Sequence, residues 1–112
     1  MPTVYITNYN PDYDYSTADE LGETVIMSRG FIPEYKLKSL ENTFNAYAKE
    51  SQPDDYLLLS GTNIVAALAA AVWMKAGKSI KFLQHGKTRS INGEPSTTYI
   101  EHYVEGTNGT TS

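Results

Sequence analysis

The sequence contains no cysteine, which excludes disulfide bonds and any zinc or iron–sulfur site that depends on cysteine ligands. It also has no long apolar run: the longest, residues 64–74, is shorter than the roughly 20 residues that span a membrane. The segment Met1–Val4 carries neither a basic region nor an apolar core, so no signal peptide is predicted. We therefore expect a cytoplasmic protein without a membrane partner.

Positive charge is also scarce. The net charge is −4, with 13 acidic against 9 basic residues, and the acidic residues concentrate in the first half. Residues 1–56 hold ten acidic and four basic side chains, whereas residues 57–112 hold three and five. Because binding to nucleic acid through its phosphates needs a basic surface, non-specific nucleic-acid binding is not expected.

What the chain does contain is typical of one small globular domain. Its 112 residues are 40% hydrophobic and 20% charged, which suits a single core of ordinary size. We expect this domain to occupy residues 1–104. Residues 105–112 are mostly glycine, threonine, asparagine and serine, so we expect a flexible polar tail there.

Apolar patterns alternate between those of strands and those of helices. Strands are predicted at residues 4–7, 24–27, 56–59, 80–84 and 97–104. Helices are predicted at residues 17–22, from Pro33 to about Ser51, and at residues 64–76. The expected core side chains on the two longer helices are Leu37, Leu40, Phe44, Tyr47, Trp73 and Met74.

Local signals define the ends of these elements. Thr17 and Glu20 have the spacing of a capping box, Thr62 or Asn63 is placed to cap the last helix, and Gly77 is placed to end it. The pair Asn92–Gly93 is a strong β-hairpin signal between the last two strands.

The resulting order is β-α-β-α-β-α-β-β. Strands that alternate with helices imply right-handed crossovers and a mostly parallel sheet, and the final hairpin adds an antiparallel strand at the C-terminal edge. The sequence therefore predicts an α/β fold: a small three-layer Rossmann-like domain.

In open α/β sheets, ligands bind outside the carboxyl ends of the strands. The turn after the apolar strand 56–59 is the sharpest candidate, with Ser60, Gly61, Thr62 and Asn63 opening a helix. The free N–H groups of a helix N-terminus favour an anion, and Gly61 would let the backbone approach it. The alternative is a tight turn with an ordinary helix cap.

The other strand ends contribute further polar residues to this predicted edge. Asn8 and Asn10 follow the first strand, Arg29 follows the second, and His85 follows the expected end of the fourth. An arginine there could bind a phosphate, or it could instead pair with Asp12 or Asp14. No G-x-G-x-x-G, P-loop or G-x-S-x-G motif is present, so no cofactor is expected.

Nine tyrosines are the most unusual component, and three of them, Tyr9, Tyr13 and Tyr15, surround Asp12 and Asp14. The two carboxylates lack the rest of a calcium loop, so no metal site is expected. The rings could stack on a base, although tyrosines in such a place more often pack over a sheet edge or form a partner surface.

Two segments resemble small uncharacterised proteins encoded by tailed bacteriophages: residues 4–8 with Asn10–Pro11, and residues 53–63. The resemblance implies a phage source, hence the host cytoplasm as location, and no particular reaction. The Ser60–Thr62 turn is also similar to the ligand-binding turn of CRISPR-associated Rossmann-like sensor domains, which bind cyclic oligonucleotides.

Two functions remain open at this point. One is a small non-enzymatic binding module for an anionic, nucleotide-like ligand that carries phosphate, held by Asn8, Asn10, Arg29, Ser60, Gly61, Thr62, Asn63 and His85. The alternative is an interaction or structural accessory protein that self-associates or binds a host protein through its Tyr-rich loop and C-terminal hairpin. Catalysis is the least supported reading, because no nucleophile–base pair is evident.

Overall fold

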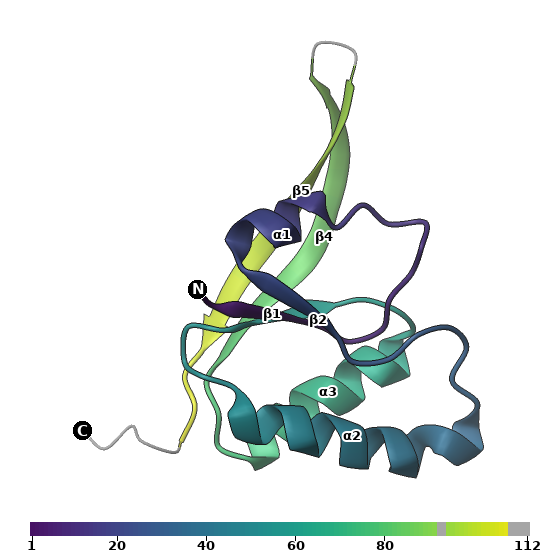
Figure 1. The fold of residues 1–112 in the computed structure, drawn as a ribbon, viewed down its shortest axis with the longest axis vertical. Coiled ribbons are helices and arrows are strands. Elements are labelled where there is room, and N and C mark those ends of the chain that lie inside the picture. The colour runs from purple at the N-terminus through teal and green to yellow at the C-terminus, as the bar shows by residue number, and fades with distance from the viewer. Residues whose placement is uncertain (92–93, 108–112) are drawn as a thin grey trace.

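The chain folds as an alternation of short strands and helices that ends in a long β-hairpin (Figure 1). The computed structural model describes residues 1–91 and 94–107, and between 85 and 98 it describes the backbone alone. The strands are β1 (Thr3–Ile6), β2 (Glu23–Ile26), β3 (Tyr56–Leu59), β4 (Ile80–Ile91) and β5 (Glu94–Val104). The helices are α1 (Ser16–Leu21), α2 (Leu37–Glu50) and α3 (Asn63–Lys75), and a 3-10 turn, η1 (Glu34–Lys36), precedes α2.

All five strands form one sheet, in the order β2-β1-β3-β4-β5. β1 to β4 are parallel, and β5 lies antiparallel to β4 at one edge. The register aligns Ile6 with both Ile26 and Leu58, so the turns after β1, β2 and β3 leave from the same edge of the sheet. The α/β class, the mostly parallel sheet and the antiparallel edge strand are confirmed.

The hairpin is longer than its sequence predicted. β4 does not end at Gln84–His85 but continues to Ile91, and β5 begins at Glu94, with an irregular register between His85 and Thr88. β3 ends opposite Gln84, so the rest of the hairpin extends beyond the sheet (Figure 1). A ribbon that leaves the sheet has no core to face and therefore lacks the apolar alternation that marks a strand. The predicted turn, Asn92–Gly93, lies outside the described residues.

The helices lie where the periodicity placed them, but the predicted Thr17 cap was wrong and the predicted Thr62 cap is confirmed in position only. Thr17 lies inside α1, which begins at Ser16, and the Asp14 carboxylate accepts a hydrogen bond from the Ser16 N–H at 2.9 Å. Thr62 does occupy the N-cap position of α3, yet its side chain makes no capping hydrogen bond. Gly77 follows α3 with a φ of 74°, as expected of a helix-ending glycine.

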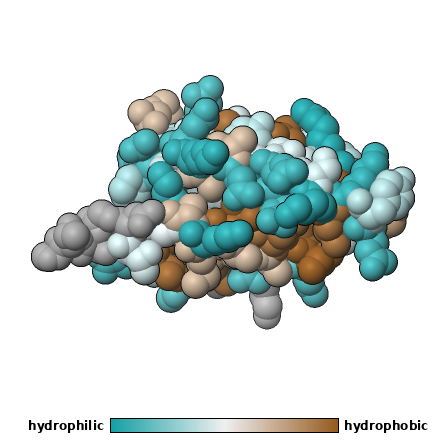
Figure 2. Space-filling view, turned by 90° about the horizontal axis from the view of Figure 1, so that it is seen from below, coloured by the Kyte–Doolittle hydropathy of each residue, from teal (hydrophilic) through white to brown (hydrophobic). Residues whose placement is uncertain are grey.

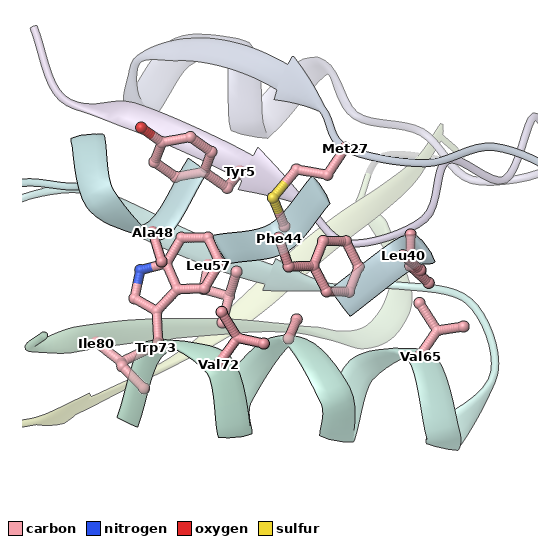
Figure 3. Close-up of a cluster of buried hydrophobic side chains, with 11 residues drawn as sticks. Tyr5, Met27, Leu40, Phe44, Ala48, Leu57, Val65, Val72, Trp73 and Ile80 are labelled. Atoms are coloured by element: carbon pink, nitrogen blue, oxygen red, sulfur yellow. The ribbon is translucent and has the colours of Figure 1, made fainter. Parts of the chain in front are cut away.

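Two buried clusters lie on opposite faces of the sheet. Figure 3 shows the larger one, where α2 and α3 pack on one face through Phe44, Val65 and Trp73. The indole N–H of Trp73 donates to Ser51 Oγ at 3.1 Å, so this buried polar group is satisfied. The smaller cluster on the other face centres on Ala18 of α1 and Leu58 of β3.

One predicted core residue is on the surface. Met74 is 62% exposed, whereas its neighbour Trp73 is 1% exposed. The prediction failed because α3 is apolar on nearly every side, so its sequence does not indicate which side faces the sheet.

The first residues after β5 contact the folded domain. The Gly106 N–H donates to Ser79 Oγ at 3.0 Å. The division into a domain at 1–104 and a flexible tail remains a prediction, since residues 108–112 lie outside the description. Among the described residues, no helix is long and apolar enough to cross a membrane.

The core makes a direct prediction about stability. Phe44→Ala should lower the free energy of unfolding by about 3–5 kcal/mol, because it removes a fully buried ring and leaves a cavity. Phe31→Ala is the matched control: Phe31 is 87% exposed, so its loss should change stability by less than about 0.5 kcal/mol. Urea denaturation of both variants measures the difference, and equal effects would contradict this packing.

Candidate functional site at the carboxyl edge of the sheet

The ends of β1 and β3 are joined by one buried threonine. Thr7 is fully buried, and its hydroxyl accepts the Ser60 N–H at 2.8 Å while donating to the Ser60 carbonyl at 2.6 Å. The Thr7 N–H also donates to the Leu58 carbonyl at 3.1 Å. These bonds fix the positions at which the two loops leave the sheet.

The loop after β1 is also joined to the loop after β2. The Asn8 side-chain amide donates to the Gly30 carbonyl at 3.0 Å, and the Tyr9 N–H donates to the Ser28 carbonyl at 2.8 Å. Ser28 Oγ lies 2.6 Å from the Thr7 carbonyl and 3.0 Å from Asn8 Oδ1, either of which can accept its proton. Asn8 is thus a buried brace between loops, with 8% of its surface exposed.

The Tyr-rich loop that follows β1 folds back onto the end of β3. The Tyr15 hydroxyl lies 2.9 Å from Ser60 Oγ and accepts the Asn10 N–H at 3.0 Å. The rings of Tyr9 and Tyr15 stack with centroids 5.3 Å apart, and Tyr13 meets Tyr15 edge-on at 6.4 Å. These rings therefore build the loop, and only Tyr13, at 44%, is largely exposed.

Two adjoining hollows open between these loops. The first, of about 310 Å³, is lined by Asn8, Tyr9, Asn10, Pro11, Tyr13, Gly30, Gly61 and Thr62. The second, of about 270 Å³, is lined by Tyr13, Leu59, Ser60, Gly61, Asn63, Ala66 and Gln84. Tyr13 and Gly61 belong to both, and none of the residues lining either hollow is charged.

The N-terminus of α3 lies beside both hollows, through Thr62 in the first and Asn63 in the second. Its first backbone hydrogen bond runs from the Ala66 N–H to the Thr62 carbonyl at 3.1 Å. The N–H groups before Ala66 have no partner within the helix, and Thr62 does not cap them. Such a terminus carries a partial positive charge of about half a unit.

Gly61 has a different role from the one expected. Its φ is 97°, which favours glycine, and a Cβ built on it would lie 2.6 Å from Asn8 Cβ. Close approach to Asn8 therefore requires glycine here, whether or not a ligand binds. This contact fits the tight-turn interpretation, and the expectation that Gly61 lets the backbone approach a ligand stays a prediction.

The two remaining predicted residues lie apart from the hollows or outside the description. Arg29 is exposed, and its guanidinium carbon lies 5.4 Å from the centroid of the Tyr9 ring. Within residues 1–91 and 94–107, no ion pair joins Arg29 to Asp12 or Asp14. The His85 backbone pairs with Tyr99 in the hairpin, and its side chain lies outside the described structure.

Of the two carboxylates, that of Asp14 contacts the backbone. The Asp14 carboxylate accepts the Ser16 N–H, which lowers the pKa of this exposed carboxyl below its ordinary value. In the part of the chain that is described, no group of three metal-ligating side chains occurs. The Tyr99 hydroxyl donates to the Asp14 carbonyl at 3.3 Å, and burial raises the pKa of that hydroxyl.

The sequence reasoning missed two residues that shape this edge. Thr7 was assigned only to a strand, although a threonine at the end of a β-rich run is placed to bond a neighbouring strand. The sequence predicts only a strand end at Gln84, yet this residue lines the second hollow.

A comparison with known families decides the origin of the chain. The model of the phage Pam3 gp32-like protein family matches residues 2–103. The chain belongs to the phage Pam3 gp32-like protein family. This membership confirms the resemblance to small bacteriophage proteins. No curated protein and no solved structure matches the chain.

Two glycines of this protein allow a matched test of the packing at the carboxyl edge of the sheet. Gly61→Ala should destabilise the protein by about 2–4 kcal/mol, because it combines an unfavourable φ with a backbone shift at Asn8. Gly30→Ala has an unfavourable φ of 68° but no atom within 4 Å of the added Cβ, so about 1 kcal/mol is expected. Thermal or urea unfolding measures both, and a larger loss in Gly30→Ala would contradict the described packing.

Proposed function

We propose that this protein is a non-enzymatic binding module for a small, phosphate-bearing, nucleotide-like ligand. The ligand would occupy the two adjoining hollows at the carboxyl edge, with its phosphate at the N-terminus of α3. Tyr13 would offer its exposed ring to the base, and the polar groups of Asn10, Thr62 and Asn63 would contact the rest.

The observation that carries this proposal is where the hollows lie. From β1 the chain moves to β2 on one side, and β3 then follows on the other side of β1. The strand order thus reverses between β1 and β3, and the first hollow is lined by residues from the loops after these two strands. Ligands of open α/β sheets bind at such reversals, outside the carboxyl ends of the strands.

The electrostatics of the hollows support an anion. The protein carries a net charge of −4, yet no acidic side chain lines either hollow. The N-terminus of α3 supplies N–H donors and a favourable dipole without requiring a basic residue. A ligand with one or two phosphates fits this arrangement better than a cation does.

The proposal also includes a three-layer Rossmann-like arrangement of the fold and a location in the host cytoplasm. The strand order and the helices on both faces in Figure 1 support a reduced, three-layer Rossmann-like domain. Family membership supports the cytoplasm of the infected host as the place of action. Binding is proposed without catalysis, because the described partner of the Ser60 hydroxyl is the Tyr15 hydroxyl and not a histidine or a carboxylate.

A second candidate function is favoured by the open edge of the sheet. Among the described strands, none pairs with the outer side of β5, and Tyr103 on this strand is 50% exposed. Edge strands pair readily with other chains, so the C-terminal hairpin could bind a host protein or another copy. The Tyr-rich loop contributes less to this reading, because its rings pack on one another.

Asn63→Asp separates ligand binding from folding. The substitution keeps the shape of the side chain but places a negative charge where the phosphate would lie. The same charge in the first turn of α3 favours the helix, so stability without ligand should be unchanged or slightly higher. Thermal unfolding is measured with AMP, a cyclic dinucleotide, inorganic phosphate and adenosine.

The expected result is a rise in melting temperature of several degrees for the wild type with a phosphate-bearing nucleotide, since saturation at 100 times the dissociation constant adds about 2.7 kcal/mol. The rise should fall by more than half in Asn63→Asp. Asn42→Asp, on the exposed face of α2, is the matched control and should retain it. No rise with any of these ligands, or an equal rise in both variants, refutes the proposal.

A further inference from the structure

The composition of α3 does not match its surroundings. From Ile64 to Met74 the helix has no charged or polar side chain, a pattern typical of helices that are buried on all sides. In this fold only one side packs inward, through Val65, Ala69, Val72 and Trp73. By contrast, α2 is amphipathic and turns residues such as Lys38, Asn42, Thr43 and Lys49 to the surface.

The uncovered side of α3 forms a continuous apolar stripe. Ile64, Ala67, Ala71 and Met74 follow one another at intervals of three and four residues, and all four are exposed. Ile64 is 58% and Met74 is 62% exposed. Figure 2, which views the molecule from the side of α2 and α3, shows a hydrophobic surface beside a hydrophilic one.

The stripe continues toward the edge of the sheet. Ile80 and Phe82 of β4 belong to the cluster beneath α3, and the register places Val104 and His102 of β5 opposite them. Ile100 lies on this same face of β5 and is 60% exposed. No described helix beyond α3 covers this part of the sheet (Figure 1).

We propose that the outer face of α3, together with the adjoining face of β5, is the interface of a homodimer. The occupant is a second copy of this chain, related by a two-fold axis, with α3 of each copy against the α3–β5 surface of the other. This surface is distinct from the carboxyl edge, so the inference does not depend on the proposed ligand.

Two features of the surface favour a second copy. The stripe from Ile64 to Met74 is uncharged, so two copies can face each other across a two-fold axis without bringing like charges on the stripe together. Ala67 and Ala71 at its centre allow two helices to approach closely. Within the stripe itself, a partner selected by charge would find no charged side chain to pair with.

The size of this surface indicates how strongly two copies should associate. A helix of 13 residues is about 20 Å long, and the helix with the adjoining strands is about 20 Å wide, which gives a footprint of about 400 Å² on each chain. Interfaces of this size lie at the weak end of specific association. The dimer should therefore form reversibly and dissociate on dilution.

Sedimentation velocity of the full chain between about 5 and 500 µM tests this. The wild type should shift from monomer to dimer over this range, and Ala71→Glu should raise the dissociation constant at least tenfold because it places like charges across the two-fold axis. Ala46→Glu is the matched control, since Ala46 is exposed on α2, and it should dimerise like the wild type. Circular dichroism checks that both variants fold. Met74→Gln is a second variant of the stripe, and it should also weaken dimerisation.

A monomer at every concentration overturns the proposal. A dimer that persists in both Ala71→Glu and Met74→Gln also overturns it, because association would then use another surface such as the hairpin edge. A monomeric wild type that binds an unrelated protein through the stripe would show that the occupant is not a second copy.

Discussion

The architecture of this protein depends on how the ends of β1 and β3 are held together. The Thr7 hydroxyl bonds to both the N–H and the carbonyl of Ser60, within a fully buried contact between strands that lie 53 residues apart in sequence. A buried hydroxyl that lost these partners would carry the full penalty of desolvation. The loops after the two strands consequently start from fixed positions, and Asn8 extends this bracing to the loop after β2.

The candidate site is a consequence of that bracing. Gly61 turns beneath Asn8 with a positive φ, and this turn directs the chain into α3, whose first residues line the hollows. Tyr15 closes the other side by contacting Ser60, while Tyr13 remains largely exposed. Asn8, Asn10, Ser60 and Tyr15 thus bond to one another or to their neighbours, whereas Thr62 and Asn63 begin α3 beside the hollows.

The sequence predicted the α/β class, the mostly parallel sheet and most element positions, because short apolar strands and the amphipathic pattern of α2 are strong local signals. It also placed Asn8, Asn10, Gly61 and Thr62 on one edge, where they line a common hollow. It failed where the signal was not local. The length of β4 depends on pairing with β5 beyond the sheet, the exposure of Met74 depends on which side of an all-apolar helix meets the sheet, and the role of Thr7 depends on a partner 53 residues away.

The proposed binding of a phosphate-bearing ligand where the strand order reverses can be followed residue by residue with NMR. Amide resonances of the ¹⁵N-labelled protein are followed during titration with AMP and, separately, with inorganic phosphate. The account predicts saturable shifts concentrated at Gly61, Thr62, Asn63 and Ile64, with smaller shifts from Asn8 to Asn10. An absence of shifts at millimolar ligand, or shifts confined to β5 or to the outer face of α3, would contradict it.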